Sequence, residues 1–286
     1  MSVRPETPRS APAELSTEVS TELSTCREVR VQREHLGAVE LVTDYVAEER
    51  PVALHYYRLP YVVMLASPAD LEDLGVGFTL SEGIVDAADE IRGVELVRDG
   101  DALAVHLNIT GERLSRILQR QRNLTGRTGC GLCGVESVEE AIRHPAPVRD
   151  GVRVTSAEIH AQLVKLQSQQ PVNLKTGSVH AAAWALPGKG IQLVREDVGR
   201  HNALDKVIGA LARAGTDASA GYLIITSRAS YEMVQKAATV GVSLVVAVSA
   251  PTALAIDLAV KTNVTLIGFA RADRHVVYAH PQRLRD

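Results

Sequence analysis

The sequence predicts an α/β protein in which a smaller α+β part precedes a larger sheet domain. In the second half of the 286-residue chain, short runs of β-branched and other apolar residues alternate with helical runs. Such alternation is typical of βα units around a largely parallel sheet that helices cover on both faces. The first half instead carries hairpin signals and few helical runs. We therefore expect two parts that meet near residues 145–156.

The α+β part is expected to follow a disordered tail. Residues 1–27 are rich in Ser, Thr, Pro and Glu, and such a segment cannot bury enough apolar surface to offset its ordering entropy. Residues 28–145 then form the α+β part, where a serine followed by proline predicts a helix start and an Asp-Gly dipeptide predicts a hairpin. The expected strands are 29–31, 39–46, 52–66, 93–98 and 102–109, and the expected helices are 67–81 and 112–121.

Residues 146–286 are expected to form the sheet domain. Its strands are predicted from short apolar runs, and its helices from longer runs that end before Gly, Pro or a polar cluster. The expected strands are 191–195, 222–226, 244–248 and 264–269, and the expected helices are 156–169, 180–186, 201–214, 231–240 and 253–260.

Charge and composition exclude several classes of partner. The net charge is −3, and 7 Tyr, 2 Phe and 1 Trp are too few for a stacking surface, so nucleic acid is not an expected partner. The most apolar stretch, 242–260, is interrupted by polar residues and is too short in apolar content to span a membrane. Three cysteines and the absence of a secretory signal favour a reducing compartment. We expect a cytoplasmic protein with no membrane partner.

Cys130 and Cys133 form a CxxC pair in a glycine-rich stretch that follows several arginines. Nearby cations favour the thiolate, which is the nucleophilic form of cysteine. Two other interpretations remain open from spacing alone. The pair could be half of a zinc site that needs two histidines from elsewhere, for instance His180 and His201, or it could be a redox pair. A redox CxxC usually opens a helix directly after a strand, whereas this one follows a helix and a loop.

Three polar segments are expected at the carboxyl ends of strands, where open α/β sheets hold their ligands. They are 196–202, 227–231 and 269–274. In the last of them, Arg271 and Arg274 are suited to clamp a phosphate or pyrophosphate, because a planar guanidinium offers paired donors. The alternative is that both arginines are solvated surface charges.

Several motifs resemble those of the FdhD family, the formate dehydrogenase accessory sulfurtransferases. The resemblance runs from about Val29 to Arg283. It rests on the segments Gly77–Gly83, Cys130–Cys133, Thr176–Ala182, Glu196–Lys206, Ser227–Lys236 and Tyr278–Arg283.

The resemblance implies a protein that receives sulfur from a cysteine desulfurase as a persulfide on Cys130, with Cys133 assisting. The sulfur then passes to the molybdenum bis-guanine-dinucleotide cofactor, which formate dehydrogenase requires. GDP-like nucleotides would be partial mimics of that cofactor. The sequence leaves the oligomeric state open, with a homodimer as one candidate. The implied cofactor-binding residues are Phe269, Ala270, Arg271, Ala272, Asp273 and Arg274.

The resemblance also implies a three-layer sheet domain related in fold to cytidine deaminases. Those enzymes use a His/Cys-x-Glu motif and a Pro-Cys-x-x-Cys motif at two helix starts for zinc binding and proton transfer. The comparable places here read His180-Ala-Ala182 and Ser227-Arg-Ala-Ser230, so neither zinc nor deamination is expected. Two alternative functions remain: a non-covalent chaperone for the cofactor, and a CxxC thiol–disulfide oxidoreductase.

Overall fold

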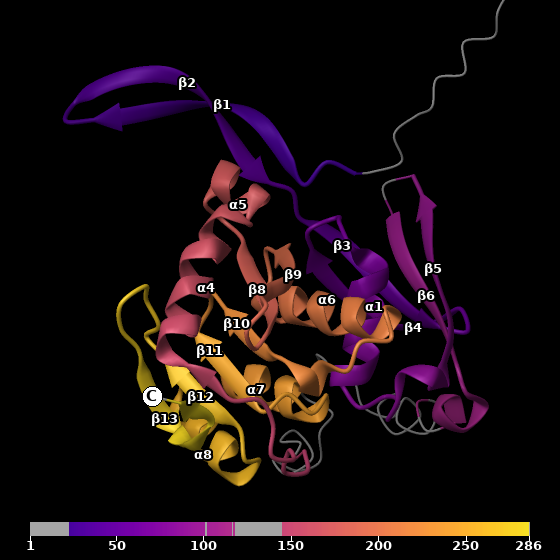
Figure 1. Ribbon diagram of the computed structural model, residues 1–286. Coiled ribbons are helices and arrows are strands. Elements are labelled where there is room, and N and C mark those ends of the chain that lie inside the picture. Colours follow the sequence, from indigo (N-terminus) through magenta and orange to yellow (C-terminus); the bar gives the residue numbers. More distant parts are fainter. Residues whose placement is uncertain (1–22, 101, 116, 118–144, 286) are drawn as a thin grey trace, which may run out of the picture.

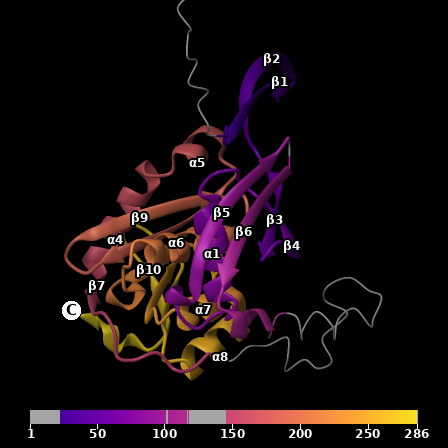
Figure 2. The same cartoon turned by 90° about the vertical axis from the view of Figure 1, so that its right-hand side faces the viewer.

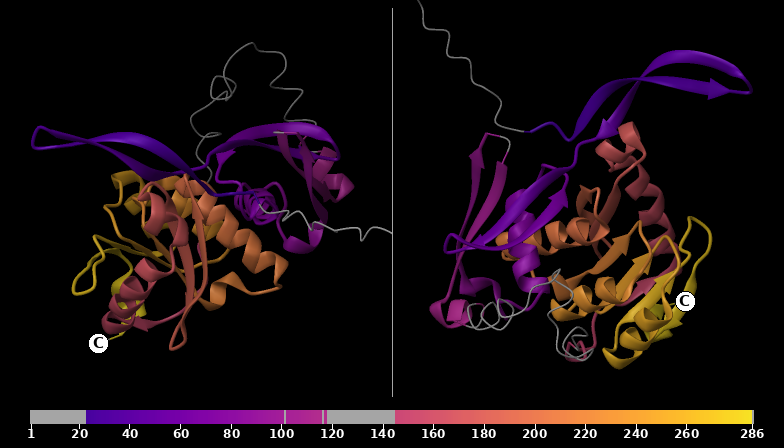
Figure 3. Two further views of the ribbon diagram at one scale, coloured as in Figure 1. Left: turned by 90° about the horizontal axis from the view of Figure 1, so that it is seen from above. Right: turned by 180° about the vertical axis from the view of Figure 1, so that it is seen from behind.

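A two-stranded ribbon projects from the body of the protein. The computed structural model describes residues 23–100, 102–115, 117 and 145–285, and the ribbon extends from the body with its turn at the far end (Figures 1, 2 and 3). It consists of β1 (Cys26–His35) and β2 (Ala38–Ala47). Leu36 and Gly37 connect the strands with φ angles of 50° and 83°, as a type I′ turn requires. The expected tail reached residue 27, whereas β1 begins at Cys26.

The α+β part is built on a four-stranded sheet with the order β4-β3-β6-β5. One expected strand, 52–66, is wrong: it is a hairpin in which Tyr57 and Arg58 turn the chain with φ angles of 51° and 67°. The strands are β3 (Arg50–Tyr56), β4 (Leu59–Ala66), β5 (Ile91–Asp99) and β6 (Ala102–Ile109).

Helix α1 (Leu71–Ser81) packs its apolar side chains against one face of this sheet. It begins four residues later than expected at Ser67. Of the second helix expected at 112–121, residues 111–115 are helical, and most of the remainder lies outside the described residues.

The larger domain contains a six-stranded sheet with the order β13-β12-β11-β10-β8-β9. Strands β10, β11 and β12 are parallel, whereas the pairings of β8, β9 and β13 are antiparallel. The prediction of a largely parallel sheet is therefore wrong. The strands are β8 (His180–Leu186), β9 (Gly190–Asp197), β10 (Tyr222–Ile225), β11 (Leu244–Ala247), β12 (Thr265–Gly268) and β13 (Val276–Ala279). A short parallel pair, β7 (Val154–Thr155) and β14 (Leu284–Arg285), lies beside it.

Helices cover both faces of the six-stranded sheet, so the domain has the three layers that were expected (Figures 1 and 3). Alternate residues of β8 show the arrangement: Trp184 packs into the core under α6, α7 and α8, and Ala183 packs into the core under α4. The helices are α4 (Ser156–Ser168), α5 (Pro171–Thr176), α6 (Arg200–Arg213), α7 (Tyr231–Thr239) and α8 (Ala253–Lys261). No described helix is long and apolar enough to cross a membrane.

Helix α1 also joins the two parts, because it lies between the four-stranded sheet and α6 (Figures 2 and 3). Glycines allow the two helix backbones to touch. A Cβ atom on Gly77 would lie 1.7 Å from the Asp205 carbonyl oxygen, and one on Gly209 would lie 1.9 Å from the Asp73 carbonyl oxygen. No side chain beyond hydrogen fits at either position.

Candidate functional site

A cavity of about 310 Å³ lies at the carboxyl edge of the parallel strands. Thr226 follows β10, Val248 follows β11 and Ala270 follows β12, and all three line it. This is the edge at which α/β sheets hold ligands. Its remaining wall comes from α4, α5 and the start of β8, including His180. The structure thus brings the expected 269–274 segment and His180 to the same cavity.

The 269–274 segment is fixed to the sheet edge by its backbone. The Phe269 amide donates to the Ser249 carbonyl at 3.2 Å, and the Ala270 amide donates to the Ala247 carbonyl at 3.1 Å. The Arg271 guanidinium donates through Nη1 to the carbonyls of Val248 and Ala270. These bonds hold Arg271 at the cavity wall.

The six expected residues differ in their relation to the cavity. Ala270, Arg271 and Ala272 line it. Phe269 is 47% exposed. The Arg274 side chain is 75% exposed, and its Nη1 lies 3.9 Å from Asp273 Oδ2. Any ligand that uses all six residues must therefore extend from the cavity onto the surface.

A pair of histidines ties the residue that follows this segment to α4. His160 Nε2 and His275 Nδ1 lie 3.0 Å apart, within hydrogen-bonding distance. Burial, followed by the neighbouring His160, lowers the pKa of His275. Nothing in the sequence indicates this contact, because 115 positions separate the two residues.

His180 lines another part of the cavity wall, and Arg200 and His201 lie near it outside the lining. Burial, Arg200 and His201, in that order, lower the pKa of His180. His201 Nε2 lies 2.6 Å from the Glu232 carboxylate, and hydrogen bonding to His201 lowers the pKa of Glu232. The contact joins the first turns of α6 and α7. Because a lowered pKa favours neutral His180, the positive charge at this edge comes from arginines, of which Arg271 lies in the cavity lining.

The acidic residues of the 196–202 segment have structural roles and do not line the cavity. Glu196 accepts hydrogen bonds from the amides of Val172 and Asn173 at 2.9 and 2.8 Å, at the start of α5. Asp197 is fully buried and accepts from the Gly199 amide at 2.8 Å. These bonds shape the turn that presents Arg200 and His201.

Other motif residues meet at the junction of the two parts. Lys236 Nζ lies 2.8 Å from Glu82 Oε1 and 3.0 Å from Asp205 Oδ2, and it donates to Ser81 Oγ at 2.9 Å. Burial would lower the pKa of Lys236, but the charges of Asp205 and Glu82 outweigh it and raise that pKa. Three motifs of the resemblance thus encode a buried contact between the parts.

The expected deaminase-like positions need one correction. His180-Ala-Ala182 was placed at a helix start, but it begins β8. The helix starts that face each other are those of α6 and α7, joined by His201 and Glu232. Within the described ranges, no group of three His, Cys, Asp or Glu side chains is placed to hold a metal ion. Cys130 and Cys133 lie outside those ranges, so their role stays a prediction.

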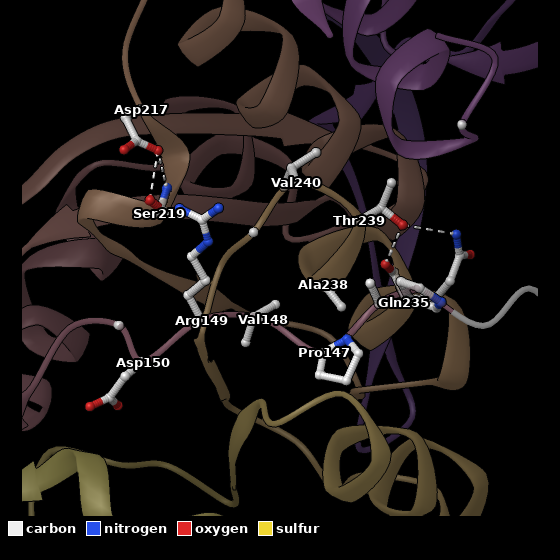
Figure 4. A pocket seen from close by; sticks show the side chains of 15 residues that line it. Pro147, Val148, Arg149, Asp150, Asp217, Ser219, Gln235, Ala238, Thr239 and Val240 are labelled. Carbon is white, nitrogen blue, oxygen red and sulfur yellow. Dashed lines mark hydrogen bonds between the residues drawn. The ribbon is translucent and has the colours of Figure 1, made fainter. Parts of the chain in front are cut away.

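A second cavity, of about 760 Å³, lies at the opposite edge of the sheet (Figure 4). Arg149, Asp217 and Ser219 lie on one side of it, and Gln235 and Thr239 on the other. Its Asp217 carboxylate is already engaged by the amide and hydroxyl of Ser219, at 2.9 and 2.7 Å. The carboxyl-edge cavity, which has Arg271 in its lining and Arg200 close to His180, is the better candidate for an anionic ligand.

Comparisons with known proteins agree on one family. The model of the FdhD/NarQ family matches residues 47–285. The chain is 53% identical over 255 residues to the sulfur carrier protein FdhD of Cupriavidus necator, covering 89% of this chain and 88% of that protein. It is 51% identical over 257 residues to the sulfur carrier protein FdhD of Xanthomonas euvesicatoria pv. vesicatoria, covering 90% and 92%.

A solved structure shows the same fold. It is described as a candidate formate dehydrogenase accessory protein from Desulfotalea psychrophila, and it superposes with a TM-score of 0.72 at 24% identity, over 92% of this chain and 100% of that one. The family model covers well over half of the sequence, and relatives at about half identity cover nearly all of it. The chain belongs to the FdhD/NarQ family.

Proposed function

We propose that the protein is a sulfur carrier for the activation of formate dehydrogenase. It accepts sulfur from a cysteine desulfurase on Cys130 and delivers it to the molybdenum bis-guanine-dinucleotide cofactor, which is the substrate of the transfer. The names of the relatives support sulfur carriage. The observation that carries the cofactor part is the carboxyl-edge cavity, because Arg271 and His180, the latter with its basic neighbours, both line it.

The positive edge suits the phosphates of a dinucleotide. Nη1 of Arg271 is engaged by carbonyls, which leaves Nε and Nη2 to donate to phosphate oxygens in a bidentate manner. Arg274 is exposed beside it and can follow a ligand that leaves the cavity. The exposed ring of Phe269 offers a face on which a guanine or pterin can stack.

The covalent steps balance with the two thiols of the CxxC pair. The Cys130 thiolate attacks the outer sulfur of the desulfurase persulfide, so that this sulfur moves to Cys130 and the desulfurase cysteine leaves as a thiolate. The Cys133 thiolate then attacks Cys130 Sγ, which expels the outer sulfur as hydrosulfide and forms a Cys130–Cys133 disulfide. A dithiol reductant must restore the pair before the next cycle. The protein is accordingly a sulfurtransferase with a persulfide intermediate.

Intact mass spectrometry after incubation with a cysteine desulfurase and cysteine tests the first step. We expect a sulfur adduct on the wild-type chain and on Cys133→Ala, and none on Cys130→Ala. Cys130→Ala should also abolish activation of formate dehydrogenase. Full activation by that variant would contradict relay through Cys130 and leave a non-covalent cofactor chaperone.

Calorimetry with GDP tests the cofactor site. A charge-assisted hydrogen bond contributes about 1.5–3 kcal/mol, so loss of one arginine should weaken binding roughly ten- to a hundredfold. We expect the double variant Arg271→Ala/Arg274→Ala to lose GDP binding and still accept sulfur on Cys130. Arg285→Ala, at an exposed arginine on β14, is the matched control. Equal affinity in the double variant and the control would place the phosphate site elsewhere.

A further inference from the structure

The β1–β2 ribbon is the part of the described chain that the site does not use. It lies almost wholly before residue 47, where the match to the family model begins. Its contacts with the body are few: β2 touches α5, where Lys175 Nζ lies 5.7 Å from the centre of the Tyr45 ring. Leu36 is 95% exposed and Leu41 is 84% exposed. A ribbon of this length with exposed apolar side chains needs a physical explanation.

An isolated two-stranded ribbon is at best marginally stable in water, and three or more strands with an apolar face are needed for stability. Among the described residues, β1 and β2 pair only with each other. The outer edge of each strand therefore presents unpaired N–H and C=O groups, which are a template for pairing with another strand. An added strand would supply both the missing hydrogen bonds and the missing apolar cover.

The turn determines which groups point outward. A two-residue turn closes on a hydrogen-bonded pair, which here is His35 and Ala38. Hydrogen-bonded and non-hydrogen-bonded pairs alternate in an antiparallel ladder, so the odd-numbered residues of β2 direct their N–H and C=O groups away from β1. The same odd-numbered positions share one face of the ribbon. Val39, Leu41 and Tyr45 are the large exposed apolar side chains among them.

The charges of β2 select one symmetric register. Two copies related by a two-fold axis pair each strand with itself, so a residue on the axis meets its own copy. An axis at Thr43 uses almost the whole of β2 and sets Leu41 opposite Tyr45 of the second copy. No like charges then face each other. An axis one residue earlier, at Val42, would set Glu40 against Asp44 twice, which is unfavourable.

The outer edge of β1 lacks such a register. An axis at Arg30 would set that arginine against its own copy, and Arg27 against Arg33. An axis at Val31 would set Glu28 against Glu34. Both registers that pair nine residues of β1 thus oppose like charges, which destabilises a cross-strand pair, and the registers that avoid this, with axes at Val29 and Gln32, pair only seven residues.

We propose that β2 is the surface through which two copies of this chain associate. The two ribbons form one four-stranded antiparallel sheet with the order β1-β2-β2-β1 and a two-fold axis at Thr43. The outward N–H and C=O groups of Thr43 form hydrogen bonds with those of Thr43 in the second copy. The apolar side chains of Val39, Leu41 and Tyr45 from the two ribbons then lie side by side on one face. The proposal is independent of the sulfur chemistry and concerns the oligomeric state, which the sequence leaves open.

Disulfide trapping tests the register in the full-length chain. In a background carrying Cys26→Ser, Cys130→Ser and Cys133→Ser, we expect Thr43→Cys to form a disulfide-linked dimer on mild oxidation, because directly opposed residues lie within the span of a disulfide. The matched control is Arg30→Cys, which lies opposite Thr43 within the same ribbon. Trapping through position 30 at least as fast as through position 43 would overturn the proposal.

Sedimentation equilibrium tests the association without a cross-link. Thr43→Asp places two carboxylates opposite each other on the two-fold axis of the dimer. Within its own ribbon the new carboxylate lies opposite Arg30, so the ribbon itself is preserved. We expect the dimer dissociation constant to rise about fivefold, the equivalent of about 1 kcal/mol. Gln32→Asp, on the same face one strand away, should change it little. A wild-type chain that sediments as a monomer, or equal effects of both substitutions, would refute the proposal.

Discussion

Lys206 Nζ lies 2.6 Å from Asp197 Oδ2, and neither side chain is exposed to solvent. The ammonium also donates to the Ser67 carbonyl at 3.1 Å, and the carboxylate accepts from the Ser67 amide at 3.0 Å. The pair therefore fixes the segment that follows β4 against the first turns of α6. Arg200 and His201 begin that helix. The position of these two side chains beside His180 therefore depends on the buried pair.

Substitution of Lys206 by methionine should destabilise the fold strongly. Removing one partner of a buried ion pair leaves the other as an uncompensated charge, which costs about 3–5 kcal/mol. Denaturant unfolding followed by circular dichroism measures the change. Lys189→Met, at an exposed turn, should stay within about 0.5 kcal/mol of the wild type. If Lys206→Met lowered the free energy of unfolding by less than about 1 kcal/mol, the ion pair between Lys206 and Asp197 would be dispensable for stability.

The contact between α1 and α6 predicts a large effect of a single methyl group. Gly209→Ala places a Cβ atom against the Asp73 carbonyl. Because the backbone cannot move aside as a flexible side chain can, we expect the free energy of unfolding to fall by at least about 3 kcal/mol, which is the upper end of overpacking costs. Gly111→Ala is the control, since nothing lies within 4 Å of the Cβ it would add. Similar melting temperatures for the two variants would contradict the close approach of the helices.

The lowered pKa of Glu90 predicts that the folded protein loses stability in acid. A hydrogen bond from Arg113 is the largest of several causes that together lower the pKa of Glu90 to about 2 from an ordinary 4.5. Because the folded pKa lies below the unfolded one, the carboxylate's contribution is complete above about pH 4.5 and is lost as the pH falls toward 2. Unfolding at a series of pH values should show a shallower acid slope for Glu90→Gln than for the wild type. Parallel slopes would mean that this pair does not titrate as described.

No stoichiometric zinc is expected in the purified protein. Ser227 and Ser230 stand at the positions compared with the two zinc-binding cysteines of deaminases, and Ala182 stands where those enzymes have the glutamate that transfers protons. A serine hydroxyl does not replace a zinc-binding thiolate. Elemental analysis of protein purified without chelator measures the content. One tightly held zinc per chain would revive the interpretation of Cys130 and Cys133 as half of a metal site.

The sequence predicts most helices and strands of the larger domain, and its main error has a clear cause. Residues 180–186 read His-Ala-Ala-Ala-Trp-Ala-Leu, and alanine is the best helix former. In the fold they form β8, which lies between β9 and β10 and is buried on both faces. Such a strand has no alternation of polar and apolar residues, so local pattern cannot distinguish it from a buried helix. Its antiparallel pairing is likewise invisible in sequence.

The candidate site was predictable in part. The 269–274 segment could be placed at a strand's carboxyl end because the preceding apolar run is short and β-branched. The contact between His160 and His275 and the contact between His201 and Glu232 could not be predicted, because each joins segments far apart in the chain. Motif residues such as Asp205 and Lys236 resemble surface charges in the sequence, yet both are buried. Burial of a charge depends on partners that only the folded chain brings together.

The backbone contact at Gly77 and Gly209 means that the two sheets are not interchangeable modules. A chain that began at residue 145 would expose the face of α6 that α1 covers. It would also deprive Lys206 of the Ser67 carbonyl and Lys236 of Ser81 and Glu82. Neither half can be grafted, swapped or inherited alone without rebuilding that surface. Any change at the carboxyl edge of the larger sheet must therefore remain compatible with α1.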